Sequence, residues 1–278
     1  MRLATLRTAQ GTIAVRIDEQ DAVEITGTAD VGALLSDPGW QERAAHADGP
    51  TRPLSQIRDE EWAPVVPRPG KIVCVGLNYR NHILEMGREL PEHPTLFAKY
   101  PEALIGPYDP IALPAIAADA VDWEAELAVI IGSKARNLSV EEAGAAIAGY
   151  SVINDVTMRD YQYRTPEWFQ GKTFEATAPF GPVLVTSDDF TLGGMLLGAV
   201  DGETVQQTPT DDLVFGPAEL VSYISQIFTL QPGDVIATGT PGGVGHARKP
   251  ARYLAPGQQL LTSVEGIGEL RNSVIAGE

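Results

Sequence analysis

Asp122-Trp-Glu-Ala-Glu126 runs directly into the apolar segment Leu127-Ala-Val-Ile-Ile-Gly132, and this stretch decides which fold and which site the chain can build. A short apolar run that ends at glycine predicts a buried β-strand. Because side chains alternate along a strand, we expect Glu124 and Glu126 on one face, about 7 Å apart. Two carboxylates on a half-buried face repel each other and are costly to remove from water. A hard divalent cation would compensate them, whereas acids at a solvated strand end would need none.

A third acid lies at the end of another apolar run. In Val152-Ile-Asn-Asp-Val156, Asp155 takes a position where carboxylates often bind ligands and where many others only cap a turn or a helix. Together with Glu124 and Glu126, it offers oxygen ligands and leaves positions for water and substrate. Such a set suits Mg²⁺ or Mn²⁺, with Ca²⁺ as a further candidate. Zinc is disfavoured because this region lacks histidine and cysteine.

The segments around these acids alternate between short apolar strands and polar loops. We expect strands over residues 12–17, 71–76, 127–132, 181–186 and 235–238. Ser139 with Glu142 forms a capping-box pattern, which predicts a helix through about Ala148. Pro217 is typical of the first position of a second helix. Its apolar face is expected to contain Leu220, Val221, Ile224, Ile227 and Phe228. The predicted fold class is therefore α+β and strand-rich.

Pro64-Val-Val-Pro-Arg-Pro-Gly70 divides the chain into two parts, because three prolines and a glycine are typical of a linker or an ordered crossing. We expect residues 1–63 to form a small N-terminal domain. Residues 64–278 are expected to form the catalytic, metal-binding domain, and nearly all of the chemically interesting polar residues follow Lys71.

The composition argues against several classes of partner. The 278 residues carry 37 acidic and 20 basic side chains, a formal net charge of −17, so nucleic acid and anionic membranes are not expected as partners. No run approaches the roughly 18 apolar residues of a membrane span, and no signal-peptide pattern is found. The single cysteine, Cys74, excludes an internal disulfide, and its apolar surroundings predict a buried side chain rather than a nucleophile. These features predict a cytoplasmic protein.

Side chains that could bind an anion follow the third acid. Because the chain is acidic, an anionic substrate would need a bound cation or a few well-placed basic residues. Arg159 and Gln162 are three residues apart, as neighbours on one helical turn, although a solvated pair would show the same spacing. Lys172 follows a glycine but lacks the earlier glycine of a phosphate-binding loop, so we reject that function.

Two further motifs follow predicted strands. In Gly76–Glu85, His82 and Glu85 have helical spacing, and a histidine held by a carboxylate is the usual general base near neutral pH. Taken alone, such a histidine is more often a structural hydrogen-bonding residue, but of the four histidines only His82 has an acid at helical spacing in a loop that follows a strand. In Ala237–Gly245, the glycines permit a close approach of backbone to ligand and Thr240 offers a hydroxyl, although a plain tight turn has the same composition. No site role is expected for the remaining histidines, His46, His93 and His246.

In their order along the chain, five motifs resemble those of the fumarylacetoacetate hydrolase family. They are G-L-N-Y-R-N-H-x-x-E from Gly76, E-x-E-L from Glu124, N-D-V-T-x-R-D-x-Q from Asn154, G-K at Gly171 and T-G-T-P-x-G-V-G from Thr238. The resemblance covers roughly residues 69–272, and residues 1–63 resemble only the variable N-terminal region of the family. It implies a mixed β-roll that is usually a homodimer.

The resemblance also implies roles for the motif residues. The implied metal ligands are Glu124, Glu126 and Asp155. The implied catalytic residues are His82 and Glu85, as a dyad on a mobile lid, and Lys172. The residues implied to contact a small-molecule 2-oxo acid are Arg159, Gln162 and Thr240. The variable substrate tail is expected to meet Met86, Arg88, Tyr161 and Tyr163.

Hydrolases, decarboxylases, isomerases and tautomerases share this framework, so the resemblance implies chemistry through the enolate of a metal-bound 2-oxo acid. The first expectation is hydrolysis of a C–C bond in a 2,4-dioxo acid of the acylpyruvate type, with His82 activating water and pyruvate enolate leaving. Oxaloacetate decarboxylation and keto–enol tautomerisation or dienoate isomerisation are alternatives. A catalytically silent protein that binds metal and 2-oxo acids is an alternative of another class.

Overall fold

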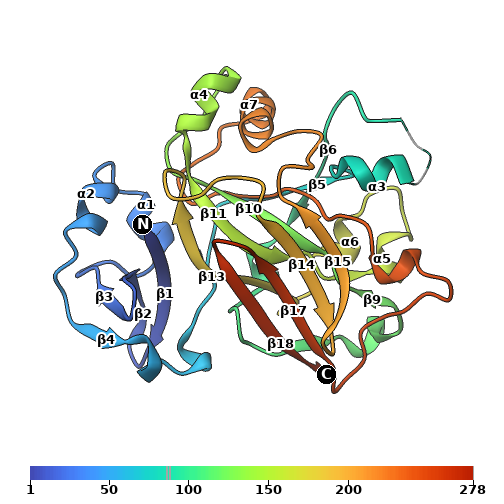
Figure 1. Cartoon of the computed structure of the whole chain (residues 1–278), viewed down its shortest axis with the longest axis horizontal. Coiled ribbons are helices and arrows are strands. Elements are labelled where there is room, and N and C mark those ends of the chain that lie inside the picture. The colour runs from blue at the N-terminus through green and yellow to red at the C-terminus, as the bar shows by residue number, and fades with distance from the viewer. Residues whose placement is uncertain (86, 88, 278) are drawn as a thin grey trace.

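The computed structural model describes residues 1–85, 87 and 89–277, and of His82 and Glu85 only the backbone. The fold is strand-rich α+β, as predicted (Figure 1). Its largest sheet has eleven strands, ten of which follow one path. The path is β4 (Thr51–Pro53), β3 (Asp21–Glu24), β2 (Gly11–Ile17), β1 (Arg2–Thr8), β13 (Ala178–Thr186), β11 (Ile147–Asn154), β10 (Ala125–Ile131), β16 (Val235–Ala237), β5 (Ile72–Gly76) and β6 (Thr95–Lys99), and β7 (Leu104–Ile105) pairs with β13.

Two smaller sheets complete the strand content. The five-stranded sheet runs β15 (Glu203–Pro209), β14 (Met195–Val200), β17 (Gln259–Val264), β18 (Gly268–Ala276) and β8 (Ile111–Leu113). The two-stranded sheet joins β12 (Thr157–Met158) to β9 (Val121–Asp122). Figure 1 shows four strands of the five-stranded sheet, β14, β15, β17 and β18, in orange and red, and they lie across β10 and β11.

Strand β10 lies at the centre of the molecule, and all seven of its residues are buried. Its continuous apolar sequence follows from cover on both faces. Ala128 and Ile130 pack with the N-terminal helices α1 (Val31–Leu35) and α2 (Trp40–Ala45). On the opposite face, Leu127 packs against the five-stranded sheet, and Val129 packs against helix α7 (Pro217–Ile227). A strand enclosed in this way needs no polar face, so the sequence shows no alternation.

The two predicted helices form, with corrected ends. Ser139 and Glu142 make the capping box of α4 (Val140–Ala145), but this helix does not reach Ala148, because Ile147 already pairs with Ile131 in the sheet. In α7, Leu220, Val221 and Ile224 are buried, as predicted. Ile227 was wrongly placed on that face: its side chain is 56% exposed, because the helix ends there and Phe228 is extended. The other α-helices are α3 (Arg80–Glu85), α5 (Arg159–Gln162) and α6 (Phe169–Lys172).

The N-terminal segment continues the large sheet. Strand β1 pairs antiparallel with β13, with Leu3 opposite Leu184. Thr5 Oγ1 donates a hydrogen bond of 2.8 Å to Val65 O in the proline-rich segment. The division at residue 63 stays a prediction. Cys74 is fully buried, as expected, and burial raises the pKa of its thiol. No helix in the described ranges is long and apolar enough to cross a membrane.

We predict opposite effects for two glycine-to-alanine substitutions. In β11, a Cβ at Gly149 would lie 2.1 Å from the carbonyl oxygen of Val185 in the neighbouring strand, and backbone cannot move aside cheaply. Gly149→Ala should lower the free energy of unfolding by roughly 1–3 kcal/mol. In α4, the nearest atom to a Cβ at Gly144 would be 3.9 Å away, so Gly144→Ala should raise it by up to about 1 kcal/mol. Urea unfolding of both variants tests this, and equal effects would contradict it.

Candidate metal centre

The three acids identified in the sequence converge where the start of β10 lies beside the end of β11. Glu124 immediately precedes β10, Glu126 is its second residue, and Asp155 follows the last residue of β11. Ala125 lies opposite Asn154 in the sheet, so the residues just outside the two strands are neighbours. Asp155 N accordingly donates to Glu124 O at 2.9 Å. Each side chain offers one oxygen, and these atoms all lie within 4.8 Å of one another. All three residues are buried.

Two lysine side chains hold these carboxylates. Lys172, at the end of α6, places Nζ 2.6 Å from Glu124 Oε2 and 2.9 Å from Asp155 Oδ2. Lys99, the last residue of β6, places Nζ 2.9 Å from Asp155 Oδ1 and donates to the carbonyl oxygen of Lys172. Both ammonium groups are almost fully buried. Gly171 allows α6, which carries Lys172, to pack closely against α5. A Cβ at this position would lie 2.6 Å from the backbone nitrogen of Gln162.

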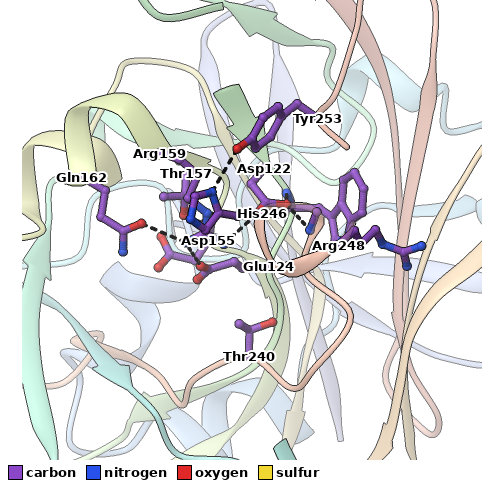
Figure 2. A network of polar contacts seen from close by, with 12 residues as sticks. Asp122, Glu124, Asp155, Thr157, Arg159, Gln162, Thr240, His246, Arg248 and Tyr253 are labelled. Carbon is purple, nitrogen blue, oxygen red and sulfur yellow. Dashed lines mark hydrogen bonds and ion pairs between the residues drawn. The ribbon is translucent and has the colours of Figure 1, made fainter. Parts of the chain in front are cut away.

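A second ionic cluster lies directly beside the first (Figure 2). Arg159 contacts Asp122 Oδ2 through Nε and Nη2, both at 2.8 Å. Its Nη1 lies 2.7 Å from Glu124 Oε1 and donates to Gln162 Oε1 at 2.9 Å. This bond fixes the orientation of the Gln162 amide, so that its NH₂ group is the one left for a ligand. Arg159 and Gln162 are therefore neighbours, as their spacing predicted, and both side chains are buried.

Burial and charge together set the ionisation of the cluster. Burial would lower the pKa of Lys172, but Asp155 and Glu124 raise it, and Arg159 is held charged in the same way by Glu124 and Asp122. For Asp155, the attraction of Lys172 and Lys99 overcomes burial and lowers the pKa. Glu126 behaves oppositely. Burial, and then repulsion by Asp155 and Glu124, raises its pKa well above the ordinary value.

The donor set fits a divalent metal ion. Among the described residues the cluster contains one more carboxylate than it contains cations. The carboxylates are Asp122, Glu124, Glu126 and Asp155, and the cations are Lys99, Arg159 and Lys172. Glu126 Oε2 accepts the Gly239 amide at 2.9 Å, and Glu126 makes no ion pair with a described residue, whereas Asp155 Oδ1 lies 2.9 Å from Lys99 Nζ. A buried, all-oxygen set of ligands with one unpaired carboxylate and a net negative charge suits Mg²⁺, Mn²⁺ or Ca²⁺.

The cluster forms the base of a pocket of about 350 Å³, a volume suited to a small ligand. Glu124, Glu126, Arg159, Gln162 and Lys172 all line it. Its aromatic walls come from Phe97, Trp168, Tyr163 and His246. An anion that enters this pocket meets buried cations and, with a divalent ion bound, a net positive charge.

The glycine-rich loop after β16 closes one side of the pocket. Thr240 lines it, but its hydroxyl donates to Ala125 O at 2.9 Å and accepts from Gln206 Nε2 at 2.8 Å. A hydrogen bond from this hydroxyl to a substrate would require it to leave Ala125, so the predicted contact of Thr240 stays a prediction. The proposed dyad cannot be placed, because the side chains of His82 and Glu85 lie outside the described residues. Met86 and Arg88, expected near the substrate tail, also lie outside them.

Sequence reasoning missed two residues that hold the site together. Asp122 accepts hydrogen bonds from Gly245 N at 2.7 Å and His246 N at 2.9 Å, and so joins the glycine-rich loop to Arg159. Its position two residues before Glu124 was the available signal. Lys99 was missed because a lysine at a strand end is ordinarily solvated. Its position after the apolar run Leu96-Phe-Ala98 was the only signal.

Comparison with known proteins gives a consistent result. The family model described as fumarylacetoacetate (FAA) hydrolase C-terminal matches residues 71–275. The chain is 41% identical over 236 residues to oxaloacetate tautomerase Fahd2a, mitochondrial, of Rattus norvegicus, covering 84% of this chain and 74% of that protein. The human oxaloacetate tautomerase FAHD2A, mitochondrial, is likewise 41% identical over 237 residues, with the same coverage.

Solved structures agree over the whole chain. A fumarylacetoacetate hydrolase from the psychrophilic Exiguobacterium antarcticum is 34% identical and superimposes with a TM-score of 0.88, covering 99% of each chain. The maleylpyruvate hydrolase of Sphingobium sp. SYK-6, solved with manganese(II) and pyruvate, is 28% identical and has a TM-score of 0.82, covering 100% of each chain.

We predict that metal binding releases a proton from Glu126. Its raised pKa means that the carboxyl group keeps its proton at pH values where an ordinary glutamate is ionised, whereas a metal ligand must be deprotonated. Affinity for Mg²⁺ should therefore increase with pH and level off above the raised pKa. Calorimetry in buffers of different ionisation enthalpy should detect the released proton, and Glu126→Gln should release none. Binding of Mg²⁺ by the unmodified protein with no proton release would contradict this.

Proposed function

The chain belongs to the fumarylacetoacetate (FAA) hydrolase family, and we propose that it interconverts the keto and enol forms of a small 2-oxo acid, with oxaloacetate as the first candidate. The observation that carries the proposal is the cluster of buried, paired charges at the base of a pocket of about 350 Å³. Enolisation develops negative charge on the carbonyl oxygen of the substrate, and the buried cations of the cluster can stabilise that charge. The names of the tautomerase relatives support the choice of substrate.

Each described residue has a part in the proposed reaction. Glu124, Glu126 and Asp155 would hold Mg²⁺ or Mn²⁺, which when bound supplies Lewis-acid stabilisation of charge on a carbonyl oxygen. Lys172 cannot act as a base, because its raised pKa keeps the ammonium group charged. It therefore stabilises the negative charge that develops as the proton leaves C3. The Gln162 amide, fixed by Arg159, donates to the substrate carboxylate and orients it.

The group that accepts the proton from C3 is assigned from the sequence alone. His82, backed by Glu85, has the helical spacing of a general base, and the backbone of α3 is helical over both residues. The same base would transfer the proton to the enol in the reverse direction. The aromatic walls formed by Phe97 and Trp168, whose ring centroids are 5.4 Å apart, would limit the access of water to the reacting carbon.

Hydrolysis of a C–C bond in an acylpyruvate is the second candidate, because the chain superimposes on a maleylpyruvate hydrolase along its whole length. That reaction needs the same charge stabilisation and, in addition, a water molecule activated by His82. Decarboxylation of oxaloacetate needs only the charge stabilisation. We infer a small-molecule 2-oxo acid as ligand, no nucleic acid or membrane partner, and a homodimer. A cytoplasmic location stays a prediction, and the tautomerase relatives carry the word mitochondrial in their names.

A direct assay separates these reactions. Stopped-flow absorbance should show that the enzyme with Mg²⁺ accelerates the decay of enol-oxaloacetate beyond the buffer-catalysed rate. Coupled assays of the same samples should show that pyruvate is released from oxaloacetate and from small 2,4-dioxo acids more slowly than enol-oxaloacetate is converted. Pyruvate release from a 2,4-dioxo acid without tautomerase activity would assign hydrolysis instead. Binding of oxalate without turnover of any of these compounds would make the protein a silent 2-oxo acid binder.

We predict that Lys172→Met lowers kcat for enolisation by roughly 10²–10³-fold, because it removes a preorganised cation from beside the reacting oxygen. The matched control is Lys134→Met, which removes an exposed lysine outside the pocket and should leave kcat unchanged. Circular dichroism and thermal unfolding would verify that both variants fold. Full activity of folded Lys172→Met would contradict the assigned role.

A further inference from the structure

Three aromatic side chains meet at the mouth of the pocket. His246 lies in a 3₁₀ turn (Gly245–Ala247) directly after the glycine-rich loop, and its ring lines the same pocket as Arg159. Its Nδ1 is 2.9 Å from the hydroxyl of Tyr253. Figure 2 draws this contact as a dashed line. The ring of Tyr163 also lies close to the imidazole, with centroids 5.1 Å apart and planes inclined by 34°. An exposed histidine thus contacts two tyrosine side chains.

The backbone of His246 is fixed as firmly as its ring. Its amide donates to Asp122 Oδ2 at 2.9 Å, and the same oxygen accepts from Arg159 Nε at 2.8 Å. The imidazole therefore has a defined position relative to the guanidinium group that orients Gln162 (Figure 2). A histidine needed only for solubility would not require these constraints.

The charges of the pocket explain what such a histidine could bind. With a divalent ion in place, the buried cluster has an excess of one positive charge, which balances the carboxylate at the 2-oxo end of a substrate. Arg159 and Lys172 are already paired with carboxylates of the protein. A second substrate carboxylate would be left without a partner, and burying an unpaired carboxylate is costly. Of the described residues that line the pocket, His246 is the basic one that makes no ion pair with a carboxylate.

The contact with Tyr253 allows two arrangements, because either Nδ1 or the phenol oxygen can accept the hydrogen bond. When the phenol hydroxyl donates to Nδ1, the imidazole proton is on Nε2. Nε2–H can then donate to an anion without any change of protonation. We propose that His246 binds the distal carboxylate of a 2-oxo dicarboxylic acid and so makes the enzyme selective for diacids. This inference rests on the proposed function, because it names the substrate class of the same site.

The test compares oxaloacetate with its 4-methyl ester, in which a methyl group replaces the distal negative charge. His246→Ala should reduce the ratio of their kcat/KM values by roughly 10–100-fold, the usual effect of losing a hydrogen bond to a charged group. His246→Gln keeps a donor and should restore part of the ratio. Tyr253→Phe, which leaves the ring tautomer unfixed, should reduce the ratio less than His246→Ala does. The matched control His46→Ala, which changes an exposed histidine at the C-terminal cap of α2, should leave the ratio unchanged.

An unchanged ratio in folded His246→Ala would overturn the proposal, as would an equal loss for both substrates. If His246→Ala fails to fold, an unchanged ratio in Tyr253→Phe would overturn it. Should the unmodified enzyme enolise neither compound, the proposed function is wrong, and binding then decides the subsite. Malate and lactate share a 2-hydroxy acid group, but only malate has a distal carboxylate. With Mg²⁺ present, His246→Ala should weaken binding of malate but not of lactate, and equal effects would overturn the proposal.

Discussion

The burial of four carboxylates in one small region is the constraint on which the rest of the structure depends. Carboxylates removed from water must be paired, and each cation that pairs them comes from a different element: Lys99 from β6, Arg159 from α5 and Lys172 from α6. Among the described residues, the four carboxylates have only three cationic partners. Glu126 is the carboxylate without one, and its pKa is raised. A site built in this way favours a divalent cation, and with that cation it favours an anionic ligand.

The architecture supplies the rigidity that such a cluster needs. Strand β10 is covered on both faces, so the acids at its start are anchored at a strand that is buried along its whole length. Short helices bring the cations to them, and Gly171 allows α6 to touch α5. Asp122 then connects Arg159 to the glycine-rich loop and to His246. Asp122 thereby links Arg159, in the charged cluster, to His246, at the mouth of the pocket. The groups proposed to stabilise charge and to select the substrate are thus held by the same side chain.

Local patterns predicted the three acids that converge at the centre of the site better than they predicted the details around them. Glu124, Glu126 and Asp155 could be found because acids beside apolar strands are unusual. Asp122 and Lys99 could not, because a residue whose role is to pair another charge has no distinctive spacing, and the partners lie far apart in the sequence. His246 was set aside because, unlike His82, it has no acid at helical spacing in a loop that follows a strand. The end of α4 and the exposure of Ile227 depend on tertiary contacts that a period of 3.6 residues does not encode.

The most direct test of the account is a crystal structure of the protein soaked with Mn²⁺ and oxalate, with anomalous scattering measured at the manganese edge. The account predicts one strong anomalous peak within coordinating distance of Glu124, Glu126 and Asp155, with oxalate bound to the ion and facing Gln162. A map with no anomalous peak there, in which the ammonium group of Lys172 alone bridges Glu124 and Asp155, would contradict the central claim that these carboxylates form a metal centre.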